Sequence, residues 1–543
     1  MASEKLTVEL VKHSLIYISE EMGVALRKSA YSPNIRERAD HSCAVLDPKG
    51  RTIGQAEHIP VHIGSFALGL KNTLKFLQKE EIELCSGDMI IVNDPYISGT
   101  HLNDITVIRP IYHAARIIGF TANKAHHVDV GGLTPASLNP FAKELAEEGI
   151  VIQPRKLIEK NVLRSDVVDM FCAGTRMPKT TMGDLRAQIA ANLLGERRVI
   201  ELAAKIGVAQ FWNACESTLD QTQRLTLSAI GKIPKGTWTG EDYLELGDEL
   251  LPIHETVTVS EEGVSVDFNG TAAQVQAPLN AVLGVTTAAV NFTVKTLMPQ
   301  ELPINDGFHR TIKIDAPEGT IVNPLRPAPV AGGNVETSQR IVDTTYRALS
   351  NAMPDRIPAA AHGSMNNLMM GGIHPENGRP WAFYETVGGG YGARKGLDGV
   401  DAVQVNMTNT MNTPVEVMEH YYPVRFESYK ILQDSGGLGE WRGGMGIERA
   451  FTAKAKVQIT LIGERHRIAP YGLWGGFPGR RSDYFVVRSN GEHVQLESKD
   501  STVLESGDKL VIRTAGGGGY GDPQKRDTEL VKTDLANGCI SEA

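Results

Sequence analysis

The chain has 543 residues, of which 41% are hydrophobic and 22% charged, and its formal net charge is −9. This length predicts two to four domains, and the composition is typical of a globular protein. The acidic charge and the lack of a basic run exclude nucleic acid as the main partner, and no apolar run is long enough to span a membrane. A polar N-terminus without a secretory signal and five scattered cysteines, with no CxxC pair, lead us to expect a cytoplasmic protein.

The N-terminal part alternates helices and strands. Apolar residues at three- and four-residue steps predict a helix over 6–30, which ends before Pro33 because the residue before a proline disfavours helical geometry. A strand is predicted over 43–46, and a second helix over 65–79. Asp40 lies just before the predicted strand, where its carboxylate can be aimed at a site.

The stretch 91–132 contains the densest group of candidate functional side chains in the sequence. Three runs of β-branched and other apolar residues predict strands over 89–92, 105–112 and 117–122. The intervening pieces are rich in Asp, Asn, Gly, Pro and Ser and are predicted to be loops. Within this stretch the candidate functional side chains are Asp94, His101, Asp104, His126, His127 and Asp129.

Imidazoles and carboxylates gathered in this way suit a divalent transition metal, with Zn, Mn and Fe all admissible. His101 and Asp104, three residues apart in a tight loop, can converge on one ion. His126 and His127 are adjacent, so on an extended strand they point to opposite sides and only one should bind the ion directly. The alternative is a buried polar network that braces the strand ends.

The remaining chain shows a change of pattern near 233–240. Before it we predict mixed loops and short helices over 133–180, a helix that opens at about 181–186, and another over 208–230. After it, strict alternation predicts a hairpin over 254–271. Further helices are predicted over 279–300 and 336–352, strands and turns over 421–520, and one short helix after 521.

These patterns predict an α+β protein: a mixed metal-binding domain followed by β-rich, glycine-rich middle and C-terminal domains. The predicted boundaries are 1–232, 233–420 and 421–543. The 55 glycines cluster in the second half, where we expect tight turns.

Several further residues are weaker candidates. Glu57, His58 and His62 are potential outer groups around the metal, and Asp184 and Gln188 share a helix face that can line a pocket. A polar, glycine-rich run suggests either a cavity wall or a docking face, through Glu385, Asp398, Asn409 and Glu416. Arg442 is interpreted as part of a turn, and Cys43 as a small core residue, because no basic neighbour would activate its thiol.

Five motifs resemble the hydantoinase B and oxoprolinase family, which includes the B subunits of N-methylhydantoinase and caprolactamase and the large subunits of acetone and acetophenone carboxylases. The matches follow the family order over essentially the whole chain. The motifs are NDPYISGTHLNDITV (93–107), AHHVDVGG (125–132), GDLRAQIAAN (183–192), DSGGLGEWRGGMGIER (434–449) and GGGGYGDPQKRD (516–527).

The resemblance implies a metal site and a partner. Carried over position by position, the metal ligands are Asp40, His101, Asp104 and His126, with His127 or Asp129 left to take a proton during catalysis. ATP and Mg are assigned to a hydantoinase A-type subunit, since this chain has no GxxxxGK[ST] loop. A heterotetramer of two A and two B subunits is expected.

The function expected from these observations is metal-assisted hydrolysis of a small cyclic amide, a lactam or imide that the A subunit has activated by phosphorylation. One alternative is the large subunit of an ATP-dependent carboxylase acting on a ketone. Carboxylase relatives carry a second histidine at the position of Val128, which favours the hydrolase. The other alternative is a non-catalytic scaffold for the ATPase subunit.

Overall fold

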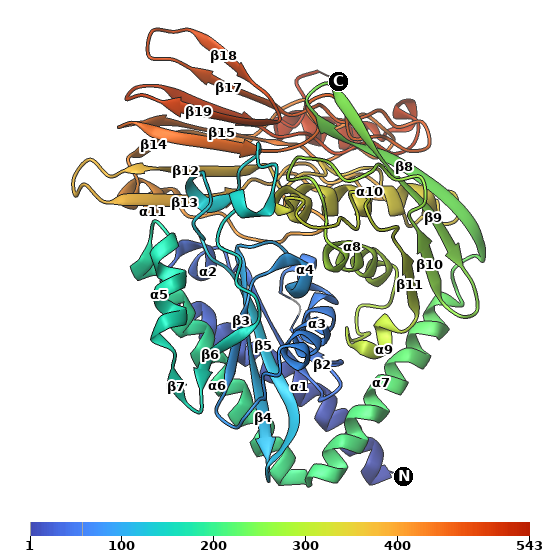
Figure 1. The fold of residues 1–543 in the computed structure, drawn as a ribbon. Coiled ribbons are helices and arrows are strands. Elements are labelled where there is room, and N and C mark those ends of the chain that lie inside the picture. Colours follow the sequence, from blue (N-terminus) through green and yellow to red (C-terminus); the bar gives the residue numbers. More distant parts are fainter. Residues whose placement is uncertain (1, 57, 543) are drawn as a thin grey trace.

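The computed structural model describes residues 2–56 and 58–542. Its seven-stranded sheet, in the order β2-β1-β5-β4-β3-β6-β7, lies in the N-terminal part, and all neighbouring strands are antiparallel (Figure 1). The strands are β1 (His41–Leu46), β2 (Thr52–Gln55), β3 (Met89–Val92), β4 (Asp104–His113), β5 (Arg116–His126), β6 (Arg155–Glu159) and β7 (Val162–Leu163).

Side-chain alternation explains how this sheet is covered. Cys43 and Val45 of β1 pack with α1 and α6, whereas Ala44 and Leu46 pack with α3 on the opposite face. The sheet is therefore sandwiched between helices. The helices of this part are α1 (Ala2–Ser29), α2 (Pro33–Arg36), α3 (Ser65–Lys79), α4 (Pro95–Ser98), α5 (Ser165–Gly174), α6 (Pro178–Ile206) and α7 (Val208–Ile230).

Most predicted elements of the N-terminal part are confirmed, but three boundaries differ. The strand predicted over 117–122 continues to His126, because the backbone of 123–126 pairs with β4 and β1. The region 133–180, predicted to be loops and short helices, also contains β6 and β7 at the edge of the sheet. The helix predicted to open at 181–186 begins earlier, with Pro178 in its first turn.

The middle of the chain forms a four-stranded sheet, in the order β11-β10-β9-β8, against which α10 packs with α8 beside it. The predicted hairpin is confirmed by the antiparallel pairing of β9 with β10. The two predicted helices are also confirmed, and a π-helical turn, η4 (Gly333–Thr337), leads into the second. The elements are β8 (Gly236–Leu246), β9 (Glu249–Val259), β10 (Val264–Asp267), α8 (Leu283–Thr296), α9 (Asp306–His309), β11 (Ile312–Asp315) and α10 (Ser338–Leu349).

Two more sheets form the layer at the top of Figure 1, in the orders β13-β12-β16-β19 and β14-β15-β20-β17-β18. The strand-rich last third and the short terminal helix are confirmed. The elements are β12 (Asn367–Ile373), β13 (Pro380–Thr386), α11 (Val415–Tyr421), β14 (Val424–Ile431), β15 (Ile447–Ala453), β16 (Val457–Ile462), β17 (Asp483–Val487), β18 (His493–Leu496), β19 (Lys499–Leu504), β20 (Lys509–Arg513) and α12 (Thr528–Ala536).

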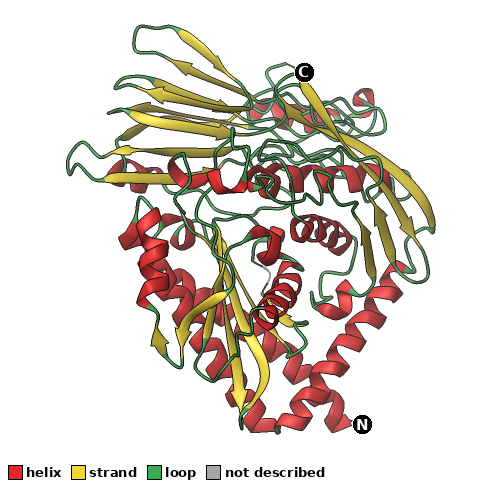
Figure 2. Cartoon of the chain, in the orientation of Figure 1, coloured by secondary structure: helices red, strands yellow, loops and turns green. Residues whose placement is uncertain are grey.

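The glycine clusters of this layer do more than form turns. Loops meet backbone to backbone beside the sheets, in the region of long loops in Figure 2. A Cβ atom on Gly443 would collide with the carbonyl oxygen of Gly517, and one on Gly516 with that of Ser435. Glycine is needed there because no side chain fits between the two backbones.

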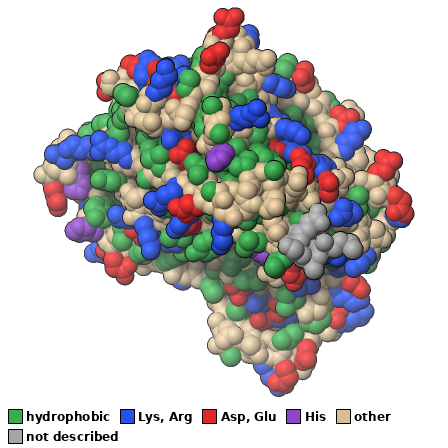
Figure 3. Space-filling model, turned by 90° about the horizontal axis from the view of Figure 1, so that it is seen from below, with side chains coloured by type: hydrophobic (Ala, Val, Ile, Leu, Met, Phe, Trp, Pro, Cys, Tyr) green, Lys and Arg blue, Asp and Glu red, His purple; other side chains and the backbone are tan. Residues whose placement is uncertain are grey.

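The mixture of helices and sheets agrees with the predicted fold class. One sheet combines strands from both sides of residue 420, and the three domain boundaries stay predictions. A distinct N-terminal metal domain is not established. In the described part of the chain, no helix has the length and apolar character of a membrane span. Lys, Arg, Asp and Glu side chains are interspersed over the face seen from below (Figure 3).

Candidate metal centre

The candidate centre lies where β4 begins and β5 ends. Asp104 opens β4 and is paired directly across the sheet with His126, the last residue of β5. His101 comes from the loop that follows α4, and Asp40 immediately precedes β1, where its carbonyl accepts a hydrogen bond from the backbone N–H of His126. Strand pairing therefore brings Asp40 and His126 to the pair His101 and Asp104, so that three separate stretches of the sequence meet.

The side chains of these four residues converge. Asp104 Oδ1 is 3.2 Å from His101 Nε2 and 3.6 Å from His126 Nδ1, and Asp40 Oδ2 is 3.9 Å from His126 Nδ1. All four residues are buried. The donor atoms of His101, Asp104 and His126 lie within 4.8 Å of one another.

The chemistry of these donors fits a divalent transition metal. Neither ring nitrogen of His101 makes a hydrogen bond of good geometry, and Nε2 of His126 has no partner either. Buried imidazoles ordinarily find a partner, and Nε2 of His101 faces the Asp104 carboxylate at 3.2 Å, an arrangement that suits a coordinated ion. That these residues hold an ion stays a prediction, for which the geometry supplies the required convergence.

Electrostatics favours the metal-binding form of two of the four side chains, Asp104 and His126. Burial raises the pKa of Asp40, and for His101 the nearby Asp104 outweighs burial and raises the pKa. Burial would raise the pKa of Asp104, but His101 and His62 outweigh it and hold that pKa well below its ordinary value. Burial together with neighbouring His101 lowers the pKa of His126 well below the ordinary range. An ionised carboxylate and a neutral imidazole are therefore present at neutral pH, as metal ligation requires.

His62 supports the centre from behind. Its Nε2 lies 3.3 Å from Asp104 Oδ2, and its Nδ1 lies 2.8 Å from Ser42 Oγ. The second oxygen of Asp104 is thus held while the first faces His101 and His126. His58 lies against His41 instead, and Glu57 lies outside the described residues.

His127 and Asp129 are not brought to the cluster. His127 points to the other side of the backbone, as strand alternation requires, and its Nε2 lies 2.9 Å from Gln188 Oε1. Asp129 accepts hydrogen bonds from the backbone of Gly131, Ala136 and Arg176 and pairs with the Arg176 guanidinium at 2.8 Å. Both placements brace loops, so the proton-accepting role predicted for them has no support from this geometry.

Other candidates in the N-terminal part have local partners. Asp94 accepts a hydrogen bond from the backbone N–H at the start of α4 and pairs with Arg326. Asp184 lies inside α6 and accepts from the backbone N–H groups of Tyr31 and Ser32. Cys43 is buried, and burial raises the pKa of its thiol, which agrees with a core residue.

A tight cavity adjoins the cluster, with a volume of about 20 Å³. That is room for about one water molecule. One wall is the cluster, and the other comes from the distant segment 334–408. The residues that line the cavity are Asp40, Ile59, Val61, His62, His101, Asp104, His126, Asn334, Val335, Met365, Tyr384, Thr386 and Thr408.

Sequence reasoning missed the second wall. The Tyr384 ring stacks on His126 with centroids 4.6 Å apart, and the guanidinium of Arg38 lies 4.6 Å from the Tyr384 ring. Tyr384 Oη donates to Asn367 Oδ1, and Asn367 Nδ2 donates to Glu336 Oε1. The segment 336–352 showed a helical pattern in the sequence, but no pattern there indicated a place beside His126.

Most candidates from the polar run near 385–416 have structural partners. Glu385 forms a buried ion pair with Arg449 at 2.7 Å, and Asn409 Nδ2 donates to the carbonyl of His58. Glu416 is exposed at the start of α11. The run contributes Thr386 and Thr408 to the cavity wall, and its role as a docking face stays untested.

Arg442 is more than the turn residue predicted from sequence. It is buried and pairs with Asp401 at 2.7 Å and with Asp534 of α12 at 3.1 Å. Arg526 pairs with the same Asp534 and with Asp398. These ion pairs fix the C-terminal helix on the glycine-rich loops.

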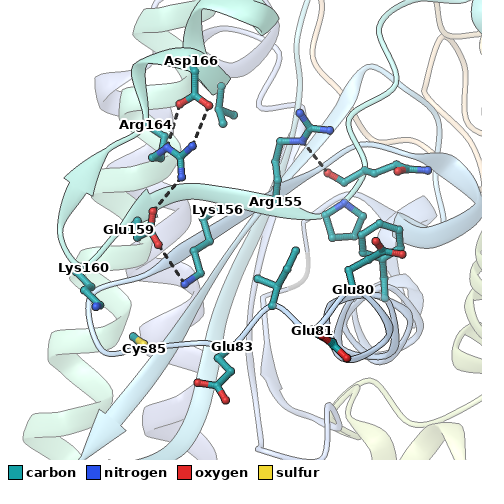
Figure 4. Close-up of a pocket in the computed structure, with 15 residues that line it drawn as sticks. Glu80, Glu81, Glu83, Cys85, Arg155, Lys156, Glu159, Lys160, Arg164 and Asp166 are labelled. Atoms are coloured by element: carbon teal, nitrogen blue, oxygen red, sulfur yellow. Dashed lines mark hydrogen bonds and ion pairs between the residues drawn. The ribbon is translucent and has the colours of Figure 1, made fainter.

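A large cavity, about 790 Å³, lies away from the cluster, at the edge of the seven-stranded sheet (Figure 4). Glu159 pairs with Lys156 at 3.6 Å and with Arg164 at 2.9 Å, and Arg164 also contacts Asp166. Part of the charge of the lining is therefore engaged in local ion pairs, as is common on a solvated surface. Size alone does not select the functional site.

The fold and the cluster together define a mixed helix-and-sheet protein with a buried histidine–aspartate centre. The family model for hydantoinase B/oxoprolinase matches residues 4–523. An uncharacterised protein of Methanocaldococcus jannaschii is 48% identical over 99% of this chain and 94% of its own length. 5-Oxoprolinase 1 of Arabidopsis thaliana is 33% identical over 95% of this chain and 41% of its own length, so the chain spans about two-fifths of that relative. The chain belongs to the hydantoinase B/oxoprolinase family.

Two solved structures share this fold. The ATP-dependent caprolactamase of Pseudomonas jessenii superimposes with a TM-score of 0.91 at 28% identity, over 99% of this chain and 94% of that one. Acetone carboxylase in its nucleotide-free form superimposes with a TM-score of 0.93 at 19% identity, over 99% and 78%. The second similarity establishes the fold alone.

Proposed function

We propose that this chain is the B-type component of an ATP-dependent cyclic amide hydrolase. The observation that carries the proposal is the buried convergence of His101, Asp104 and His126 on one small cavity, in a chain of this family. Two relatives support the substrate class: one is named as a 5-oxoprolinase and the other as a caprolactamase, and both names denote cyclic amides.

An amide is a poor electrophile, so the reaction needs activation. In the proposed division of labour, an A-type partner binds ATP and phosphorylates the amide oxygen, and this chain completes ring opening. The proposed assembly contains two A and two B subunits. A divalent ion at the centre would supply Lewis-acid chemistry and make a nearby water more acidic.

The residues of this chain have distinct parts in that reaction. Asp104, His101, His126 and Asp40 would hold the ion, and His62 fixes the second oxygen of Asp104. Tyr384 covers the face of His126, and apolar side chains such as Val61 and Met365 exclude bulk water from the cavity. A dry cavity strengthens every electrostatic interaction at the reacting carbon.

A carboxylase that acts on a ketone is the second candidate: acetone carboxylase shares this fold, and the fold by itself does not select the reaction. Val128 stands where the carboxylase relatives place a second histidine, which favours the hydrolase. A carboxylase consumes bicarbonate and a hydrolase does not, so product analysis separates the two. A scaffold without catalysis is the third reading, and it requires the cluster to be dispensable for turnover.

The test is metal content and turnover of the purified chain with its A-type partner. Wild type should carry about one divalent ion per chain, and His101→Ala should lose both the ion and ring opening. His113→Ala, at an exposed histidine of β4, is the matched control and should retain both. Full turnover by metal-free protein, or by His101→Ala, would overturn the proposal.

A further inference from the structure

Asn334 is a polar residue of the cavity wall whose side-chain oxygen lacks a hydrogen-bond partner. It belongs to the π-turn η4 and lines the cavity opposite the cluster. The residue is 4% exposed, and its Oδ1 is buried without a hydrogen-bond partner. π-Turns occur frequently at functional sites.

The backbone holds Asn334 in this position. Gly333 packs so closely on the preceding segment that a Cβ atom there would collide with the carbonyl oxygen of Asn280, and its N–H donates to the Pro278 carbonyl. Two residues beyond Asn334, Glu336 accepts from Asn367 Nδ2 and from the backbone N–H of Met365. The turn is therefore fixed on both sides of Asn334, and its carboxamide is presented to the cavity.

The other neutral polar side chains of the wall are already engaged. Tyr384 Oη donates to Asn367, Thr386 Oγ1 accepts from Arg38, and Thr408 Oγ1 contacts Thr410 Oγ1. Among the described lining residues that are neither histidine nor aspartate, Asn334 alone keeps a buried oxygen that no donor reaches. A buried acceptor without a partner is unfavourable for the fold, so a bound molecule is expected to supply the donor.

We propose that Asn334 binds and orients the water that attacks the activated amide carbon, an inference that rests on the proposed function. The cavity, at about 20 Å³, holds about one water molecule, so a water there meets both the cluster and Asn334. An O–H of that water donates to Asn334 Oδ1. The water oxygen then bonds to the activated carbon, the ring C–N bond breaks, and the departing nitrogen takes the proton that the water loses. The acyl phosphate left behind releases phosphate on hydrolysis by a second water.

The first test is stability, which needs no partner subunit. Asn334→Leu removes a buried polar group that lacks a partner, so its Tm should equal or exceed that of wild type. Asn367→Leu is the matched control, because this buried asparagine is fully engaged and its loss should lower Tm. A clear fall of Tm in both variants would make Asn334 a structural residue and overturn the inference.

The second test is the coupling of ATP hydrolysis to ring opening in the assembled enzyme, with metal content measured alongside. Asn334→Leu and Asn334→Ala should retain the ion, continue to hydrolyse ATP, and open the ring about 10²-fold more slowly. The ratio of ATP consumed to ring opened should rise accordingly. A raised KM with an unchanged ratio would assign Asn334 to the substrate instead and overturn the inference. Absence of ring opening by wild type would refute the proposed function itself.

Discussion

Asp104 is the residue on which the centre depends. One of its oxygens faces His101 and His126, and the other faces His62. Its carboxylate therefore links three imidazoles that come from three separate segments. No other described residue of the cluster contacts all three histidines.

We expect Asp104→Asn to abolish metal retention and ring opening while the chain still assembles with its partner. The substitution keeps the shape of the side chain but removes the charge that an ion requires. Metal content, turnover and co-purification with the A-type subunit are the measurements. Retained turnover, or loss of folding, would place Asp104 in a bracing network instead.

His362 makes stability depend on pH. It is fully buried beside Asn366, and burial lowers its pKa from 6.5 to about 3. The neutral form is therefore favoured in the folded protein. The stability that it contributes is fully present above pH 6.5 and is lost as pH falls towards 3.

Unfolding by urea between pH 7 and 4 should show this loss, which amounts to at most about 4 kcal/mol. His362→Gln should reduce the slope of the free energy of unfolding against pH, and the buried His41, His309 and His466, whose pKa values are also lowered by burial, account for part of what remains. His113→Gln, at an exposed position, should leave the dependence unchanged. Equal slopes for all three proteins would contradict the assignment.

At the scale of elements, β4, β5 and η4 position the site. The first two carry the cluster at their paired ends, and η4 carries Asn334 on the facing wall. The close packing of Gly333 on Asn280 is what fixes η4.

Gly333→Ala should therefore destabilise the protein by several kcal/mol, on the order of an overpacked core site. The added methyl group meets backbone rather than a flexible side chain. Gly231→Ala, at the end of α7, is the control: its Cβ would make only ordinary contacts, and its effect should be small. Urea denaturation measures both, and similar small effects would show that η4 can shift.

The strands were predictable because period-two and β-branched patterns are local. Alternation predicted that only one of His126 and His127 faces the cluster, and the family resemblance selected His126, whose Nδ1 lies 3.6 Å from Asp104. The second wall was not predictable. Tyr384 and Asn334 reach the cluster only through contacts between segments distant in sequence, and such contacts leave no periodic signal.

At the scale of the whole molecule, ion pairs join segments that are distant in the sequence, and local sequence patterns do not predict such contacts. Asp534 of α12 pairs with Arg442 and Arg526, and all three side chains are largely buried. The sequence predicted only a turn at Arg442. Its ion pair with Asp534 was not predictable because α12 is distant in the sequence.

Asp534→Ala should lower the free energy of unfolding by roughly 3 kcal/mol, since it leaves two buried guanidinium groups with fewer counter-charges. Thermal unfolding measures the loss. Asp527→Ala, at the exposed start of the same helix, should cost about 1 kcal/mol through its lost cap. If the two variants behave alike, the buried pairs do not hold the helix in place.

The two walls of the cavity are encoded in two separate stretches of the sequence. The residues that would hold an ion are encoded in 40–126, whereas six of the nine other residues that line the cavity are encoded in 334–408. Selection can therefore revise substrate preference in one stretch of the gene without disturbing the reactive centre in the other. Enzymes of this fold that act on different carbonyl compounds are expected to differ most in the second stretch.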